Sequence, residues 1–108
     1  MIKNKSLIIA SYHKFITSTK DIATGLMFSK PKTLLFGFKR SRKISLHMWF
    51  VFFPIDVLFL DADFYVVEIK RLFKPWTFYS SKTTCNYIVE TPAGRIGDTS
   101  VGDKITID

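Results

Sequence analysis

Along most of the chain, apolar residues alternate with polar ones or form short runs bounded by turn-forming residues. This pattern is typical of β-strands rather than helices. We therefore expect a mainly β fold, a small barrel-like domain of about six or seven short strands, because full closure protects sheet edges. The strands are predicted over residues 7–16, 33–38, 46–53, 55–60, 64–72, 84–91 and 104–107.

One segment departs from the strand pattern. Ser18-Thr19-Lys20-Asp21 resembles the capping box that begins a helix, with an acidic residue three positions after a hydroxyl. Gly25 suits the left-handed position just past a helix end, where a side chain is disfavoured. The sequence thus predicts one or two short helices, with a first one beginning at Ser18 and Leu26-Met27-Phe28 folding back onto the core.

The clearest tertiary prediction is a hairpin made by residues 55–60 and 64–72, with Asp61-Ala62-Asp63 as its turn. Alternate apolar residues share a face in each strand, and we expect this face to be buried: Ile55, Val57 and Phe59 in the first strand, Val67 and Ile69 in the second.

Charge is distributed unevenly along the 108 residues, which we expect to form a single domain. The net charge is +7, yet residues 1–48 hold ten Lys or Arg and one acid, while residues 49–108 hold six Lys or Arg and eight acids. The densest basic cluster should lie on an exposed hairpin tip, because several cations cannot be buried unpaired. This cluster is the candidate for binding RNA or another polyanion, with a merely solvated loop as the alternative. It consists of Lys39, Arg40, Arg42 and Lys43.

Targeting signals are weak. The apolar run at residues 7–10 is too short for a signal peptide. The longest apolar stretch, residues 46–60, is interrupted by Pro54 and polar residues and is too short to span a membrane. Cys85 is the only cysteine, so no intramolecular disulfide can form. We therefore expect a cytoplasmic protein with no transmembrane segment.

Recognisable catalytic chemistry is missing from the sequence. His13, His47 and Cys85 lack metal-ligand spacing, and neither a nucleophile motif nor a glycine-rich phosphate loop is found. We therefore expect no metal, no cofactor and no assignable catalytic residue. This favours a non-enzymatic binding or interaction module, with a polyanion or a protein as its partner, over an enzyme.

Asp56 is the unusual polar residue, because it lies between Ile55 and Val57 in the most apolar part of the chain. A buried carboxylate must be hydrogen-bonded, paired with a cation or protonated. We expect backbone N–H groups at a bulge near Pro54 to donate to it. The alternative is a small-molecule pocket or enzyme site around Asp56, with Trp49 and Glu90 as further candidates for ligand binding.

Aromatic residues beside basic ones can stack on bases and hold phosphates. In the sequence, the best such group combines three aromatic residues with four cations: Trp76, Phe78 and Tyr79 near Lys70, Arg71, Lys74 and Lys82.

Several segments, in order, resemble the family called domain of unknown function 192, also known as uncharacterised protein family 0127. The resemblance covers about residues 15–107 and rests on these segments: Gly25-Leu26-Met27-Phe28, Leu35-Phe36-Gly37-Phe38, His47-Met48-Trp49-Phe50, Pro54-Ile55-Asp56-Val57-Leu58-Phe59-Leu60-Asp61, Val66-Val67, Glu90-Thr91-Pro92-Ala93-Gly94 and Gly102-Asp103.

The resemblance implies a compact, β-rich, barrel-like domain of an archaeal-type branch, and it implies no established activity. One departure concerns the segment after the Met-Trp motif. Many family members have a polar Asn-Thr pair there, whereas this chain has Val51-Phe52-Phe53.

Overall fold

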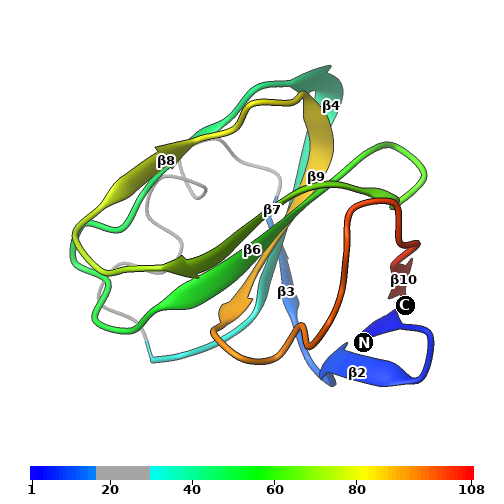
Figure 1. The fold of residues 1–108 in the computed structure, drawn as a ribbon, viewed down its shortest axis with the longest axis horizontal. Helices are drawn as coiled ribbons and strands as arrows, with labels where there is room; N and C mark the ends of the chain where they lie inside the picture. Colours follow the sequence, from blue (N-terminus) through cyan, green and yellow to red (C-terminus); the bar gives the residue numbers. More distant parts are fainter. Residues whose placement is uncertain (17–29) are drawn as a thin grey trace.

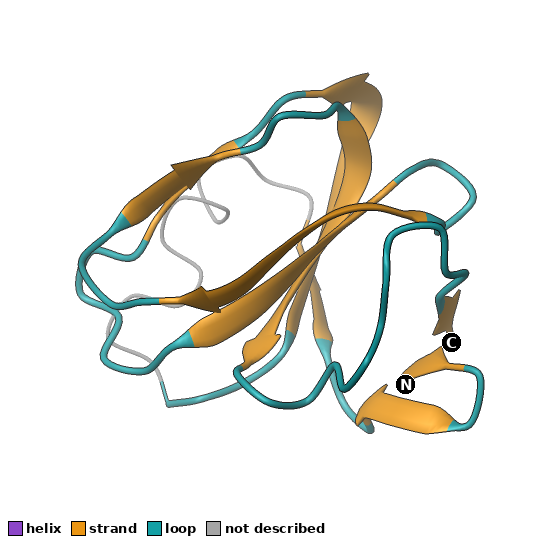
Figure 2. Cartoon of the chain, in the orientation of Figure 1, coloured by secondary structure: helices purple, strands orange, loops and turns teal. Residues whose placement is uncertain are grey.

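A computed structural model gives the fold of residues 1–16 and 30–108, and these residues form strands and loops without a helix (Figures 1 and 2). The mainly β prediction is therefore confirmed. The predicted helix beginning at Ser18, its Gly25 and the apolar residues after it lie outside the described residues. Ten strands follow one another along the described part of the chain: β1 (Ile2–Asn4), β2 (Leu7–Ala10), β3 (Lys14–Ile16), β4 (Leu34–Arg42), β5 (Ser45–His47), β6 (Ile55–Leu60), β7 (Val66–Phe73), β8 (Phe78–Ser80), β9 (Cys85–Pro92) and β10 (Thr106–Ile107).

The described strands form three sheets rather than a closed barrel. The largest has the order β3-β4-β9-β6-β7, and its only parallel pair is β3 with β4. A sheet of β10, β1 and β2 and a two-stranded sheet of β5 and β8 complete the set. Figure 1 shows β8 on one side of the long central strands and β2 and β10 on the other.

Both faces of the central sheet are buried, which is why strand β6, paired with β9 on one side and β7 on the other, is buried at all six positions. One face contributes Leu34, Val57 and Phe59 to a core cluster that also contains Leu46 of β5. The opposite face contributes residues such as Leu58 to a second cluster, which also contains residues of β1 and β2. Burial is thus achieved by layering sheets, and strand closure is not needed to cover the apolar faces.

The predicted hairpin is present as β6 and β7, and Ile55, Val57 and Phe59 are fully buried. The predicted pairing of faces is wrong for β7, because the register shifts at Val67. Leu58 then lies opposite Ile69, and Phe59 lies opposite Glu68. A bulge adds one residue to a strand. The side chains after the bulge therefore point to the opposite faces from those that simple alternation predicts.

Two predicted strands are broken. Residues 7–16 form the separate strands β2 and β3, which belong to different sheets. The predicted strand at residues 46–53 ends at His47, because the chain turns at Met48, whose carbonyl accepts hydrogen bonds from the backbone N–H groups of Val51 and Trp76. The aromatic residues after Met48 therefore lie in a loop.

Candidate functional site

Lys39, Arg40 and Arg42 lie in β4, and Lys43 directly follows its end, so the predicted location of the basic run on a hairpin tip is wrong. Strand β4 continues through Gly37 to Arg42. Gly37 pairs with Tyr87 and Arg42 with Cys85, so four residues of β4 lie opposite a single residue of β9. The extra residues form a large bulge, and this bulge makes Lys39 and Arg40 exposed, as the sequence predicted for them.

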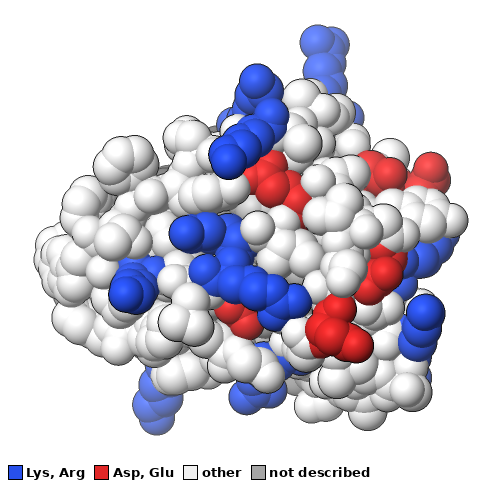
Figure 3. All heavy atoms as spheres, in the orientation of Figure 1, with Lys and Arg blue, Asp and Glu red and all other residues white. Residues whose placement is uncertain are grey.

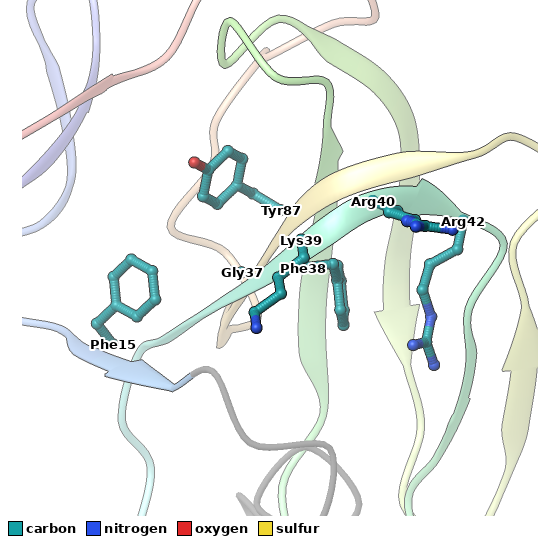
Figure 4. A pocket seen from close by; sticks show the side chains of 7 residues that line it. All are labelled: Phe15, Gly37, Phe38, Lys39, Arg40, Arg42 and Tyr87. Carbon is teal, nitrogen blue, oxygen red and sulfur yellow. The ribbon is translucent and has the colours of Figure 1, made fainter.

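This bulge borders an open pocket of about 660 Å³, which we call the β4 groove (Figure 4). Strand β3 pairs with β4 only as far as Phe36, and no other described residue pairs with β4 on that side beyond it. The pocket begins where this pairing stops. It is lined by Phe15, Gly37, Phe38, Lys39, Arg40, Arg42 and Tyr87.

The aromatic part of the groove depends on Gly37. The Phe15 ring lies over this glycine, so a Cβ there would come within 2.9 Å of Phe15 Cζ and 3.3 Å of Tyr87 Cε1. Figure 4 shows the rings of Phe15 and Tyr87 on the same side of β4, near Gly37. Phe15 remains 51% exposed, which leaves a large part of its ring accessible to a ligand.

The charged part of the groove is entirely cationic. Among the described residues that line it, Lys39, Arg40 and Arg42 are basic and none is acidic. The Arg42 guanidinium lies 5.2 Å from the centroid of the Phe38 ring, a cation–π contact that orients it beside the groove. On the face of the molecule shown in Figure 3, Asp and Glu side chains gather mostly in the right half.

The structure therefore separates the four predicted cations. It brings Lys39, Arg40 and Arg42 to one pocket and leaves Lys43, although exposed, outside the pocket lining. Sequence reasoning missed Phe15 and Tyr87 as their aromatic neighbours, because strand pairing alone brings these residues to β4. The available signal was Gly37, since a glycine inside a strand often marks a close approach by another group.

The aromatic–basic group predicted further along the chain does not line this groove. Phe78 is 72% exposed on β8. Lys70 Nζ lies 5.3 Å from the centroid of the Tyr79 ring, whose hydroxyl donates a short hydrogen bond to Glu68. These contacts hold β7 and β8 together, so Lys70 and Tyr79 have a structural explanation.

Asp56 is held by backbone donors, as the sequence predicted. The N–H groups of Leu72 and Gly94 donate to its two carboxylate oxygens, each at 2.9 Å. The bulge that frees the Leu72 N–H lies in β7, where two residues lie opposite Asp56, and Leu72 itself has φ of 49°. Because each carboxylate oxygen accepts a hydrogen bond from the backbone, Asp56 has the environment of a structural residue.

Glu90 points away from Asp56, so the predicted pocket joining them with Trp49 is not formed. Glu90 lies opposite Leu34 and Val57 in the ladder and shares their face, whereas Asp56 points to the other face. The Glu90 side chain is 6% exposed. Burial raises the pKa of Glu90 to about 8.

Trp49 lies in an exposed aromatic cluster and not beside either carboxyl. Its ring centroid is 6.2 Å from that of Trp76, and the Phe50 and Phe52 rings also contact Trp76 edge-on. Phe50 and Trp76 both have positive φ, of 60° and 64°, a backbone conformation that bulky residues rarely adopt. The cluster is an apolar surface feature, separate from the residues that line the β4 groove.

Glu68 is a third buried carboxyl, and sequence reasoning missed it. Its Oε1 accepts hydrogen bonds from the backbone N–H groups of Lys82 and Thr83 and from the Thr83 hydroxyl, at 2.8–2.9 Å. Its other oxygen accepts the hydrogen bond from Tyr79. Burial acts to raise the pKa of Glu68, but these hydrogen bonds outweigh it and hold the pKa below its usual value. The bond to Glu68 raises the pKa of Tyr79 to about 12.

Metal binding has no structural support in residues 1–16 and 30–108, where no group of three or more His, Cys, Asp or Glu side chains could hold an ion. Within the same ranges, no helix is long and apolar enough to cross a membrane.

Several archaeal proteins are similar to this chain in sequence. The chain is 44% identical over 75 residues to a UPF0127 protein of Pyrococcus horikoshii, a match that covers 67% of this chain and 64% of that protein. It is 46% identical over 63 residues to a UPF0127 protein of Thermococcus sibiricus, a match that covers 56% of this chain and 40% of that protein. A UPF0127 protein of Pyrococcus furiosus is 43% identical over 86 residues, a match that covers 75% of this chain and 73% of that protein. The chain thus spans less than two thirds of the first two of these relatives.

Two solved structures share the fold. One is a protein from Sinorhizobium meliloti that was proposed to be a transcription regulator, with a TM-score of 0.79 and 24% identity over 87% of this chain and 79% of that one. The other is a protein of unknown function from Novosphingobium aromaticivorans. Its TM-score is 0.80 and its identity is 18%, over 88% of this chain and 74% of that one. At these identities, the likeness shows the fold alone.

A family model described as "Uncharacterized ACR, COG1430" matches residues 8–107. Together with the archaeal relatives, this match shows that the chain belongs to the DUF192 family, as the resemblance in its sequence predicted.

Proposed function

We propose that this chain is a binding module and that the β4 groove holds a polyanion rich in phosphate groups. The observation that carries the proposal is the lining of the groove, where three cations and three aromatic rings meet and none of the described lining residues is acidic. Such a lining attracts anions over long range and repels cationic ligands.

The bulge in β4 supports this proposal. Lys39 and Arg40 lie where the ladder between β4 and β9 is interrupted, so their charges extend into solvent instead of pairing with a neighbouring strand. The only ion pair formed between described side chains or termini is that of Met1 with Asp108, so no described carboxylate neutralises the groove. Flexible surface cations that have no acidic partner are the residues that usually contact phosphates.

The test compares two variants of equal net charge. In the groove variant, Lys39, Arg40, Arg42 and Lys43 are all replaced by Gln. In the control variant, four exposed cations outside the groove are replaced by Gln: Lys74, Lys82, Arg95 and Lys104.

Binding to inorganic polyphosphate and to a single-stranded oligonucleotide is measured by fluorescence anisotropy at one salt concentration. We expect the groove variant to lose about tenfold or more in affinity for both, since each phosphate contact contributes electrostatically. The control variant should lose several-fold less. Equal losses in the two variants would mean that net charge alone matters, and would refute the groove as the site.

A further inference from the structure

The aromatic rings of the β4 groove indicate which polyanion it holds. A ligand that carries only phosphates or sulfates needs cations and gains little from exposed aromatic faces. The groove places the half-exposed Phe15 ring and the neighbouring Tyr87 ring beside the three cations. From this juxtaposition we infer that the ligand is a single-stranded nucleic acid, with a base stacked on Phe15 and its phosphates on Lys39, Arg40 and Arg42. This inference rests on the proposed function.

Gly37 is the residue that makes stacking geometrically possible. Because Gly37 has no Cβ, the Phe15 ring can approach β4 closely beside Tyr87, while about half of Phe15 stays exposed. Tyr87 is supported from behind by Phe64, with ring centroids 4.7 Å apart, which fixes its orientation. A fixed pair of rings costs little entropy when a base stacks on it, and stacking tolerates any base.

The dimensions of the groove favour a single strand over a duplex. A volume of about 660 Å³ is within the usual range for sites that hold a ligand of small-molecule size. The bases of a duplex are stacked inside the helix and cannot stack on a ring that lines such a pocket, whereas the bases of a single strand can be splayed out onto it. A duplex would contact the exposed cations only through its phosphates.

The experiment separates the bases from the phosphates. The probes are a 12-residue oligothymidylate, a 12-residue oligouridylate and an abasic deoxyribose-phosphate oligomer of the same length, each about as long as a typical single-strand site. The variants are Phe15→Leu, which keeps an apolar side chain but removes the π-face, and Phe15→Trp, which enlarges it. Phe78→Leu is the matched control, because Phe78 is an exposed aromatic outside the groove.

We expect the two base-bearing oligomers to bind about tenfold more tightly than the abasic oligomer, in line with the usual contribution of one stacked base. Phe15→Leu should remove most of this difference, Phe15→Trp should keep it, and Phe78→Leu should leave it unchanged. Urea melts of each variant show whether it is folded, and Phe15 tolerates substitution because it is half-exposed.

Three results would contradict the inference in different ways. If the abasic oligomer binds as tightly as the others and Phe15→Leu has no effect, the groove binds phosphate alone, and the proposed function stands without the stacking. If Phe78→Leu reduces base-dependent binding and Phe15→Leu does not, the base lies elsewhere. If none of the oligomers and no polyphosphate binds, both the inference and the proposed function are wrong.

Discussion

Replacing Glu90 with Gln should change the pH dependence of folding in a direction that is unusual for a carboxyl group. Glu90 is buried between Leu34 and Val57, and burial raises its pKa to about 8. Gln has nearly the shape of the protonated side chain and does not titrate. The variant therefore reports the wild-type protein with the proton permanently in place.

The sign follows from proton binding. Between the ordinary pKa of 4.5 and about 8, Glu90 keeps its proton in the folded state and has lost it in the unfolded state. The unfolded state then binds fewer protons, so the free energy of unfolding falls as pH rises through this range. Over the full range, the pKa difference corresponds to at most about 5 kcal/mol, and relaxation around the charge should reduce this to about 3–4 kcal/mol. That is a large fraction of the stability of a typical domain.

The measurement is urea denaturation of the wild type and of Glu90→Gln at pH 5, 6.5 and 8. Other titrating groups contribute equally to both proteins, so the difference between their free energies of unfolding isolates Glu90. We expect this difference to move in favour of the variant by about 2–3 kcal/mol between pH 5 and pH 8, because part of the effect already lies below pH 5. A difference that stays constant with pH would refute the reasoning, because it would mean that the carboxyl group titrates alike in both states.

Three further predictions concern stability. Phe59→Ala should lower the free energy of unfolding by about 3–5 kcal/mol in urea melts, because Phe59 is fully buried, and a loss below about 1 kcal/mol would contradict its place in the core. Asp56→Asn should cost about 1–3 kcal/mol, because an amide can accept from only one of the Leu72 and Gly94 N–H groups, and an equally stable variant would disprove the structural role. Glu68→Gln should destabilise the protein above the ordinary carboxyl pKa, with the loss shrinking as pH falls through the lowered pKa of Glu68, and melts in which that loss grows toward acid would show the opposite sign.

The strands and much of the core were predictable because they depend on local pattern. Alternation around Ile55, Val57 and Phe59 identified β6. This strand has apolar residues on both faces because a hydrophobic core covers each face of the central sheet. The donors to Asp56 were also predictable, since a buried carboxylate in a strand must find N–H groups.

The register of β7 was not predictable, because a bulge leaves no local signature in a strand rich in β-branched residues. The shift at Val67 turns Glu68 toward Phe59 and into its buried hydrogen-bond network, whereas alternation alone placed Glu68 away from the core. Layering in place of barrel closure was hidden for a similar reason, since the contacts between sheets join residues that are far apart in sequence.

The candidate site was half predictable. The cations at residues 39–43 stand out in the sequence, and so does Gly37. The rings of Phe15 and Tyr87 reach the groove only through the pairing of β3 and β9 with β4, across long stretches of chain. Local neighbours therefore directed the search for stacking residues to Trp76 and Phe78, which do not line the groove.

The salt dependence of oligonucleotide binding shows whether the β4 groove contacts phosphates. The affinity of the 12-residue oligothymidylate is measured across a series of salt concentrations for the wild type, for the groove variant lacking all four cations, and for its charge-matched control. For a single strand contacted by three or four cations, the slope of log affinity against log salt should be about −2 to −3 in the wild type and the control, and close to zero in the groove variant. Equal slopes in all three proteins would contradict the account, because they would show that the β4 groove contacts no phosphates.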